Sequence, residues 1–257
     1  MSARWLLLAA LVPAKALASV PVPATIPPVP APAAGAVSAV TATPCVPDAM
    51  PPGDWPSLCH YRDANRTIDV PPRAVMIGDS ITEFWLPASP ALFSEGIVDR
   101  GVHGQTSTQI VARFYQDVVR LRPHVVHILC GINDIAGNTG FASPDAYANA
   151  ILAMVDMARA NGIAVVVGSI LPAGSFSWRP GYHPAAQVVA FNAWLRDLTQ
   201  RRGLMYADYY SAMAAPDGSM KPGLSIDGVH PNAAGYAIME PIARAAIGEA
   251  ERHMPKP

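Results

Sequence analysis

The chain has 257 residues, of which 51% are hydrophobic and 14% are charged, and its formal net charge is −1. This balance provides neither a basic surface for nucleic acid nor an acidic tail, so it excludes nucleic acid as the expected partner and favours small uncharged substrates. After the N-terminal stretch, no segment is apolar for the ~20 residues that a membrane span needs.

Residues 1–18 have the pattern of a secretory signal peptide. Arg4 gives a positive start, residues 5–12 are apolar, and Ala16 and Ala18 provide a small-residue cleavage site. Lys15 interrupts this pattern, and the alternative is an N-terminal tail that is not removed. The pattern predicts an exported protein, located in the periplasm or outside the cell.

Residues 19–52 are expected to form a linker that precedes one domain at 53–257. Ten of the 33 residues from 20 to 52 are proline, and such a composition favours extended backbone over a packed core. The ~200 residues that follow match the usual size of a single domain.

The three cysteines divide into an expected pair and a free thiol. Cys45 and Cys59 lie in a loop-rich stretch at the start of the domain, so we expect a disulfide between them in an exported chain. Cys130 ends an apolar run, and a small buried thiol in a strand is a more common role than a nucleophile.

Short apolar runs alternate with helical stretches along the domain. This alternation predicts a parallel five-stranded sheet covered by helices on both faces, in the flavodoxin-like order 2-1-3-4-5. The expected strands are Ala74–Ile77, Ile97–Arg100, Val125–Leu129, Ile163–Val167 and Leu204–Ala207. One helix is predicted from Pro144, capped by Ser143, to Asn161–Gly162, and another from His183–Pro184 to Gly203.

Ser80 is the strongest candidate for a nucleophile. It follows an apolar strand and Gly78, which we expect to supply the backbone freedom for a sharp turn into a helix. A serine hydroxyl needs an imidazole to accept its proton and a carboxylate to orient that imidazole. His230 and Asp227, three residues apart, can supply both from one loop.

Two further residues are candidate donors to an oxyanion. Gly104 follows the second strand, and its backbone N–H could approach a substrate without interference from a Cβ. Asn133 follows the third strand and offers a side-chain amide donor. Because the carboxyl ends of parallel strands share one edge of the sheet, we expect these donors to lie near Ser80.

The chain resembles the SGNH hydrolases, also called the GDSL esterase and lipase family. The resemblance rests on four ordered blocks, which are Gly78-Asp79-Ser80, Arg100-Gly101-Val102-His103-Gly104-Gln105-Thr106, Gly131-Ile132-Asn133-Asp134 and Asp227-Gly228-Val229-His230-Pro231. It implies a three-layer α/β/α sandwich with Ser80 as nucleophile, His230 as base and Asp227 as its orienter. It also implies an oxyanion hole made of the Ser80 and Gly104 N–H groups and the Asn133 amide.

The chain departs from the family pattern at Arg100, where asparagine is common, and at Ile81, where leucine is common. Thr82 stands where the α/β-hydrolase motif Gly-x-Ser-x-Gly has its last glycine, which weakens that alternative fold. We assign Asp79 and Asp134 to hydrogen bonding within their loops and not to proton transfer.

No cofactor or metal is expected. His124 and His127 are three residues apart in a strand and would point to opposite faces, so they are poor candidates to share a metal. The sequence contains no glycine-rich phosphate-binding motif. His103 and His183 fall near the predicted mouth, where they could contact substrate or simply lie on the surface.

An aromatic loop follows the fourth strand. Trp178, Arg179 and Tyr182 are expected to bind substrate, by stacking on a sugar or an apolar leaving group. The alternative is that the rings of this loop only attach it to the domain.

These features predict an exported serine esterase that hydrolyses short-chain esters through an acyl-enzyme on Ser80. The family resemblance implies acetyl groups on carbohydrates as the first choice, with lipid and aryl esters as alternatives. The substrate would be a small-molecule or polysaccharide ester. Acyl transfer to a sugar hydroxyl would use the same residues. A carbohydrate-binding protein without turnover is the third hypothesis, and the complete set of catalytic residue types argues against it.

Overall fold

The computed structural model describes residue 45 and residues 53–140 and 142–253. The expected signal peptide at 1–18 lies outside the described residues, as does the expected linker at 19–52 apart from Cys45. Among the described helices, none combines the length and the apolar character that a membrane crossing requires.

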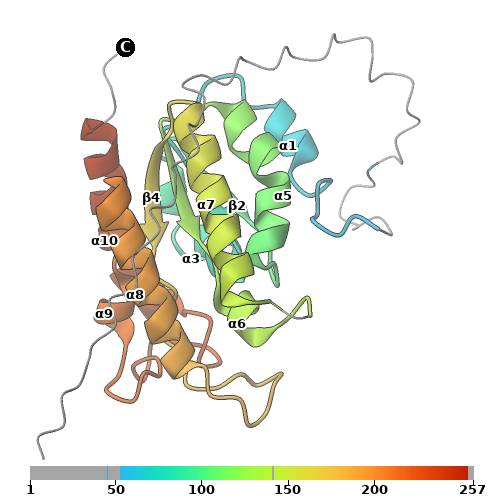
Figure 1. Cartoon of the computed structure of the whole chain (residues 1–257). Helices are drawn as coiled ribbons and strands as arrows, with labels where there is room; N and C mark the ends of the chain where they lie inside the picture. Colours follow the sequence, from blue (N-terminus) through green and yellow to red (C-terminus); the bar gives the residue numbers. More distant parts are fainter. Residues whose placement is uncertain (1–44, 46–52, 141, 254–257) are drawn as a thin grey trace, which may run out of the picture. The chain divides into compact units, whose positions relative to one another are not determined.

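The core of the domain is an all-parallel sheet in the order β2-β1-β3-β4-β5. Figure 1 shows this sheet among the helices of the domain. Its strands are β1 (Ala74–Gly78), β2 (Ile97–Gly101), β3 (Val125–Leu129), β4 (Ala164–Gly168) and β5 (Met205–Ala207). Both the predicted topology and the predicted strands are confirmed, although β4 and β5 begin one residue later than expected. Gly78 pairs with Gly101 and with Leu129, so β1, β2 and β3 end level with one another. The segments that follow them therefore share one edge of the sheet.

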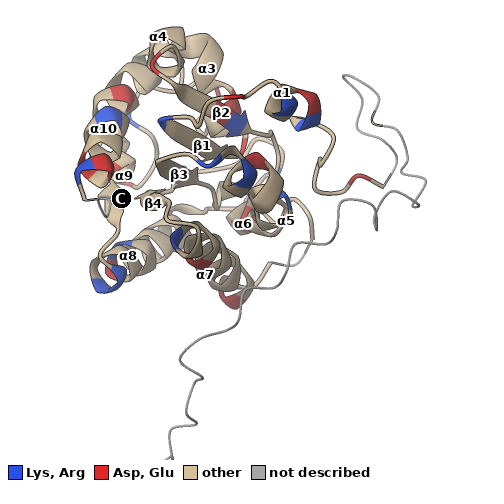
Figure 2. Cartoon of the chain, turned by 90° about the horizontal axis from the view of Figure 1, so that it is seen from above, with Lys and Arg blue, Asp and Glu red and all other residues tan. Residues whose placement is uncertain are grey.

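Helices cover both faces of the sheet (Figure 2). One face carries α5 (Ser107–Asp117), α7 (Pro144–Ala160) and α8 (Ala185–Arg202), with α1 (Arg62–Arg66) packed on α5. The other carries α2 (Ser80–Glu83), α3 (Trp85–Ala88), α4 (Pro90–Phe93), α9 (Tyr209–Met213) and α10 (Ala233–Arg252). The remaining elements are the 3₁₀ helix η1 (Val119–Leu121) and α6 (Ile132–Ala136), which follows β3. This is the predicted α/β/α sandwich.

Helices α7 and α8 begin and end close to the capping residues that predict them. The Ser143 hydroxyl accepts a hydrogen bond from the Ala146 N–H at 3.0 Å at the start of α7. Helix α8 follows Pro184 and ends at Gly203, whose φ of 64° is the left-handed conformation that glycine adopts easily. Both helices run back from the edge that carries the polar segments.

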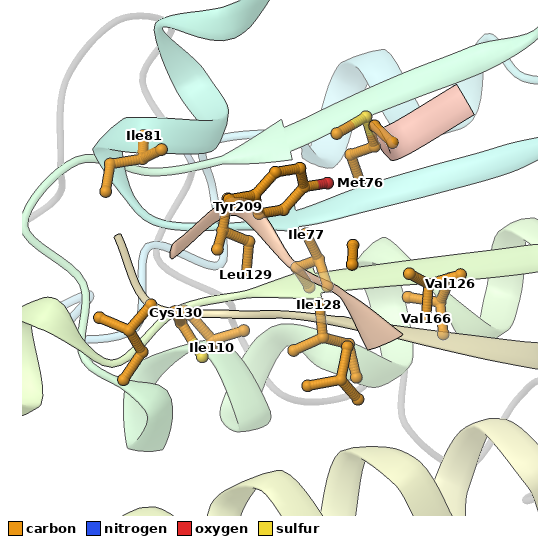
Figure 3. Close-up of a cluster of buried hydrophobic side chains, with 14 of the residues drawn as sticks. Met76, Ile77, Ile81, Ile110, Val126, Ile128, Leu129, Cys130, Val166 and Tyr209 are labelled. Carbon is orange, nitrogen blue, oxygen red and sulfur yellow. The ribbon is translucent and has the colours of Figure 1, made fainter. Parts of the chain in front are cut away.

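The central strands are buried along their whole length because helices pack on both of their faces. Every residue of β1 and β3 is buried, and Figure 3 shows Met76, Ile77, Val126 and Ile128 within this core. Cys130 is a free thiol in the same core, and burial raises its pKa well above the ordinary value. A thiol in these surroundings stays protonated, in agreement with a structural role.

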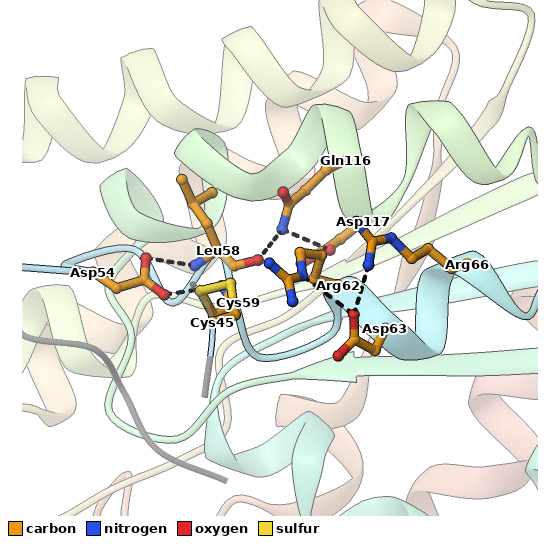
Figure 4. The surroundings of a disulfide bond; sticks show 9 residues. All are labelled: Cys45, Asp54, Leu58, Cys59, Arg62, Asp63, Arg66, Gln116 and Asp117. Atoms are coloured by element: carbon orange, nitrogen blue, oxygen red, sulfur yellow. Dashed lines mark hydrogen bonds and ion pairs between the residues drawn. A yellow bond between two sulfur atoms is a disulfide. The ribbon is translucent and has the colours of Figure 1, made fainter. Parts of the chain in front are cut away.

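A disulfide joins Cys45 to Cys59 at the start of the domain (Figure 4). The Asp54 carboxylate accepts hydrogen bonds from the N–H groups of Leu58 and Cys59, at 2.7 and 2.9 Å. From α5, the Gln116 side-chain amide donates to the Leu58 carbonyl at 2.8 Å. The cross-linked segment is thus attached to the helix that follows β2.

Candidate active site

Ser80 is the first residue of α2, directly after the turn that ends β1. Asp79 caps this helix, because its Oδ1 accepts a hydrogen bond from the Ile81 N–H at 3.0 Å. Ser80 is only 4% exposed, and its hydroxyl faces a histidine from the other end of the chain. The turn therefore holds the hydroxyl in one place at the edge of the sheet.

Gly78 serves this turn for a reason other than the one predicted. It lies within β1 and is not among the glycines with positive φ, so backbone freedom is not what the position requires. A Cβ at Gly78 would instead lie 2.2 Å from the Thr82 Oγ1 and 2.3 Å from the Leu129 carbonyl oxygen. Only glycine lets α2 and β3 approach β1 this closely.

His230 lies between Ser80 and Asp227. Its Nε2 is 2.9 Å from the Ser80 Oγ, and its Nδ1 is 2.7 Å from the Asp227 Oδ2. The second Asp227 oxygen accepts hydrogen bonds from the N–H groups of Val229 and His230, at 2.9 and 2.8 Å. Partial burial raises the pKa of Asp227, but these backbone bonds and the imidazole outweigh burial and lower it overall. The carboxylate therefore stays ionised beside the ring.

Ser225, which the sequence analysis missed, closes the loop that carries this pair. Its hydroxyl accepts from the N–H groups of Asp227 and Gly228, at 3.2 and 2.7 Å, and donates to the His230 carbonyl at 2.9 Å. Gly228 has a φ of 88°, which lets the chain turn back. These local bonds bring the Asp227 carboxylate to the imidazole.

Three N–H groups in the segments that follow β1, β2 and β3 are available to a ligand. Among the described residues, no hydrogen bond uses the backbone N–H of Ser80 or of Gly104 as its donor. Gly104 has a φ of 73°, and apart from its two chain neighbours no described residue has a heavy atom within 4 Å of the position of its absent Cβ. The buried Asn133 amide donates one N–H to the Gln105 carbonyl at 3.0 Å, which leaves its second N–H free.

The family model for the GDSL-like lipase/acylhydrolase family matches residues 76–238. The chain belongs to this family. As a member, it is a carboxylic ester hydrolase, and the resemblance noted from its four sequence blocks is confirmed. The match extends from β1 into α10. It includes Ser80, Gly104, Asn133, Asp227 and His230.

Solved structures of GDSL acylhydrolases share the fold. A protein of Bacteroides fragilis NCTC 9343 assigned as an acylhydrolase is 38% identical, with a TM-score of 0.75 over 77% of this chain and 99% of that one. A GDSL-like lipase of Bacteroides thetaiotaomicron VPI-5482 is 35% identical, with a TM-score of 0.74 over 76% of this chain and 98% of that one. The acetylxylan esterase Axe2 of Geobacillus stearothermophilus is 18% identical, with a TM-score of 0.56 over 70% and 96%, and shows only the shared fold. The comparison with curated proteins finds no match.

Arg113 links the parts of this acylhydrolase that surround Ser80. Its side chain is fully buried and forms an ion pair with Asp117 at 3.0 Å. It also donates to the Gly78 carbonyl at 2.9 Å and to the Gln105 side chain at 2.6 Å. Sequence reasoning missed Arg113, although its place on the same face of α5 as Ile110, Phe114 and Asp117 marks it as a charged residue directed at the core.

Two partly exposed rings flank His230. The Phe84 ring centroid is 5.6 Å from the imidazole centroid, and that of Trp178 is 6.4 Å away. The sequence analysis proposed Trp178 but missed Phe84, which follows α2 directly. Arg179 and Tyr182 lie elsewhere, on the wall of a neighbouring cavity of about 530 Å³ between α6, α7 and α8, with the Arg179 guanidinium 4.1 Å from the Tyr182 ring centroid.

The two carboxyl groups beside the motif residues accept hydrogen bonds within the protein, although the buried Oδ2 of Asp79 has no partner among the described residues. Asp134 accepts from both the N–H and the hydroxyl of Ser107, which ties α6 to the start of α5. Burial raises the pKa of Asp134, while those bonds oppose the rise. Burial raises the pKa of Asp79 to about 7, and the nearby Asp134 charge adds to the effect.

The four histidines that the sequence analysis considered as metal ligands or substrate contacts lie in different settings. His127 is buried in the sheet, its Nε2 is 2.7 Å from the Tyr209 hydroxyl, and burial lowers its pKa to about 4, while His124 is exposed. The exposed His103 contacts Glu83, and the exposed His183 contacts the Gly174 carbonyl. Across residues 53–140 and 142–253, three or more His, Cys, Asp or Glu side chains nowhere gather as a metal site would require.

Proposed function

We propose that this acylhydrolase is a serine esterase whose reaction passes through an acyl-enzyme on Ser80. The observation that carries the proposal is the continuous line from the Ser80 Oγ through both ring nitrogens of His230 to the Asp227 carboxylate, with distances of 2.9 and 2.7 Å. An imidazole within hydrogen-bond distance of a serine hydroxyl can accept its proton. The ionised Asp227 then stabilises the imidazolium and fixes the ring so that Nε2 faces Ser80.

The first half-reaction forms the acyl-enzyme. As His230 removes the hydroxyl proton, the Ser80 oxygen attacks the ester carbonyl, and the carbonyl oxygen becomes an oxyanion. The N–H groups of Ser80 and Gly104 and the free amide N–H of Asn133 are proposed to receive that charge. The tetrahedral intermediate then collapses, and the protonated His230 gives its proton to the departing alcohol.

The second half-reaction releases the acid. Water loses a proton to the neutral His230 and attacks the acyl carbonyl, and Ser80 leaves with a proton returned by the imidazole. The same steps with a sugar hydroxyl in place of water would transfer the acyl group. We propose water as the acceptor, since the family is one of acylhydrolases.

We propose a short acyl group, acetyl above all, on a carbohydrate alcohol as the substrate. The partly exposed rings of Phe84 and Trp178 near His230 support this choice, because aromatic faces stack on sugar rings. The low net charge agrees with an uncharged substrate. An acetylxylan esterase is among the proteins of the same fold. Arg179 and Tyr182 would contact more distant parts of a longer substrate.

We also propose that the protein is exported, that residues 1–18 are a signal peptide, and that residues 19–52 link it to the domain. The disulfide between Cys45 and Cys59 supports export, because such bonds persist in oxidising compartments. Intact-mass measurement of the protein recovered from outside the cytoplasm tests this. A chain that starts at Ser19 is expected, and a chain that retains Met1 to Ala18 would contradict it.

Substrate selectivity is tested with p-nitrophenyl esters of increasing chain length, then with acetylated xylan and acetylated chitooligosaccharides, with Ser80→Ala as the blank. We expect kcat/KM to be greatest for acetate and acetate to be released from at least one polysaccharide. Assays with an added sugar acceptor separate hydrolysis from transfer, because a transferase would form a new ester. A preference for long acyl chains would contradict the acetyl proposal.

A further inference from the structure

Asn133 carries the proposed side-chain donor to the oxyanion, and the function of this donor depends on which way its amide faces. An asparagine amide has one accepting end and one donating end of nearly the same shape. If the amide of Asn133 turned over, it would present a carbonyl oxygen to the developing negative charge. Some feature of the molecule must therefore hold the donating end toward the substrate.

We infer that Asn138 and the Trp178 indole hold the Asn133 amide in its productive orientation, so that the aromatic loop after β4 positions the oxyanion hole. This inference rests on the proposed function, because it assigns a role to residues that act through Asn133. Asn138 is thus a positioning residue, while Trp178 has this role in addition to its proposed contact with substrate.

A directional series of hydrogen bonds carries the inference. The Trp178 Nε1 donates to the Asn138 Oδ1 at 3.1 Å, and the Asn138 Nδ2 donates to the Asn133 Oδ1 at 2.6 Å. The Asn133 Nδ2 then donates to the Gln105 carbonyl at 3.0 Å. Every bond in this series runs in the same direction, from the indole to the backbone carbonyl.

The two ends of the series fix its direction. An indole N–H can only donate, so the amide oxygen of Asn138 must face Trp178. The Asn138 nitrogen then faces Asn133, whose oxygen must face Asn138. The Gln105 carbonyl, which can only accept, requires the same orientation of Asn133 from the other side. Reversal of either amide would place two oxygens or two N–H groups against each other.

The aromatic loop is well attached to the helix that carries Asn133. The Trp178 ring stacks on the buried Phe176 ring with centroids 4.9 Å apart. The Arg179 guanidinium donates at 2.7 Å to the carbonyl of Ala136, which is the last residue of α6. In addition, the Asn138 N–H donates to the Asn133 carbonyl at 3.1 Å. These contacts keep the indole at a constant place relative to α6, as a positioning role requires.

The test compares Asn138→Ala and Trp178→Phe with the wild type on p-nitrophenyl acetate. Trp178→Phe keeps a ring but removes the indole N–H, and a minimal ester leaves out contacts to a sugar. We expect kcat to fall about tenfold in Asn138→Ala, less than the 10² to 10³ expected for complete loss of one oxyanion donor, with KM within about twofold of the wild type. Trp178→Phe should show the same pattern to a smaller extent.

A double-mutant cycle separates positioning from a general structural effect. If Asn138 acts through Asn133, then Asn138→Ala should cause no further loss of kcat in an Asn133→Ala background. Trp178→Phe should likewise have no effect in the Asn138→Ala background. If the losses of kcat in the two single variants multiply in the double variant of either cycle, the inference is overturned. Changes of equal size in kcat and KM would also overturn it.

Asn161→Ala is the matched control, because it also removes an asparagine amide that donates a hydrogen bond, here to the Met157 carbonyl at the far end of α7. It should leave kcat unchanged. The outcome of Asn133→Ala distinguishes the two levels of the proposal. Wild-type kcat in Asn133→Ala would refute the proposed oxyanion hole itself, whereas a loss there with wild-type kcat in Asn138→Ala would refute only the positioning chain.

Discussion

The two sides of the proposed site are fixed in different ways. Ser80, Gly104 and Asn133 follow the level ends of β1, β2 and β3, and the buried Arg113 ties the first of these segments to the second. Asp227 and His230 belong instead to a partly exposed loop whose order comes from bonds within residues 225–231. The nucleophile and its proposed oxyanion donors are thus placed by the sheet and its core, while the base is supplied by a loop that is ordered by its own hydrogen bonds.

This difference predicts how substitutions on each side will behave. Changes to Asp227 or His230 should alter activity and leave the stability of the fold nearly intact, because both side chains are partly exposed. Changes around the nucleophile should alter stability as well, because the groups that place it are buried.

The largest expected effect is the loss of turnover in His230→Ala. A serine triad that loses its base typically loses on the order of 10⁶ in kcat, and Ser80→Ala should match it. Because His230 belongs to the exposed loop, its replacement should shift the melting temperature by no more than about 2 °C. Steady-state kinetics and calorimetry on both variants check this, and a strong loss of stability in His230→Ala would contradict the comparison.

Arg113→Met should destabilise the buried side of the site, which carries the nucleophile. It leaves Asp117 buried without its partner and removes the bond to the Gly78 carbonyl, so we expect the free energy of unfolding to fall by about 3 to 5 kcal/mol. Arg202→Met is the control, since its ion pair with Asp156 is exposed and should contribute less than about 1 kcal/mol. Urea unfolding of the two variants gives the comparison, and equal losses would show that burial of Arg113 is unimportant.

Asn133→Ala should affect the chemical step more than substrate binding. Loss of one oxyanion donor lowers transition-state stabilisation by about 2.7 to 4 kcal/mol, and this loss should appear in kcat with little change in KM. Stopped-flow measurement of the acylation rate on p-nitrophenyl acetate tests the effect directly. A raised KM at unchanged kcat would assign Asn133 to ground-state binding.

The smallest effect concerns the pH dependence of stability. Burial raises the pKa of Asp79 from its ordinary value of 3.8 to about 7, so the native state keeps a proton that the unfolded chain loses. The resulting stability is fully present below pH about 4 and is lost as pH rises through about 7. Asp79→Asn keeps the oxygen that caps α2 but cannot titrate. It should therefore remove this pH dependence, a change in the free energy of unfolding of order 1 to 3 kcal/mol. Urea unfolding between pH about 4 and about 8 measures the slope, and an identical slope in both proteins would contradict the raised pKa.

The sequence predicts those parts of the molecule that depend on local patterns. Apolar runs and capping residues such as Ser143 and Gly203 predict the strands and helices, because neighbouring residues determine them. The closeness of Asp227 and His230 in sequence made their pairing a natural expectation. The alternation of strands and helices then brought the candidate residues to one edge.

The residues that the sequence analysis missed act over long separations or through detailed geometry. Arg113 bonds to Gly78, 35 positions away, and Asn138 accepts a hydrogen bond from Trp178, 40 positions away. No periodic pattern reports such contacts. The role of Gly78 was also mistaken, because the close approach of Thr82 and Leu129 depends on packing between elements and not on the local turn.

Covalent labelling of the nucleophile tests the central proposal most directly. Wild-type protein, Ser80→Ala and His230→Ala are treated with a fluorophosphonate, and the modified peptide is identified by mass spectrometry. The proposed mechanism predicts one adduct on Ser80 in the wild type, none at that position in Ser80→Ala, and labelling slowed by several orders of magnitude in His230→Ala. An adduct on another serine, or labelling of Ser80 at the wild-type rate without His230, would contradict it.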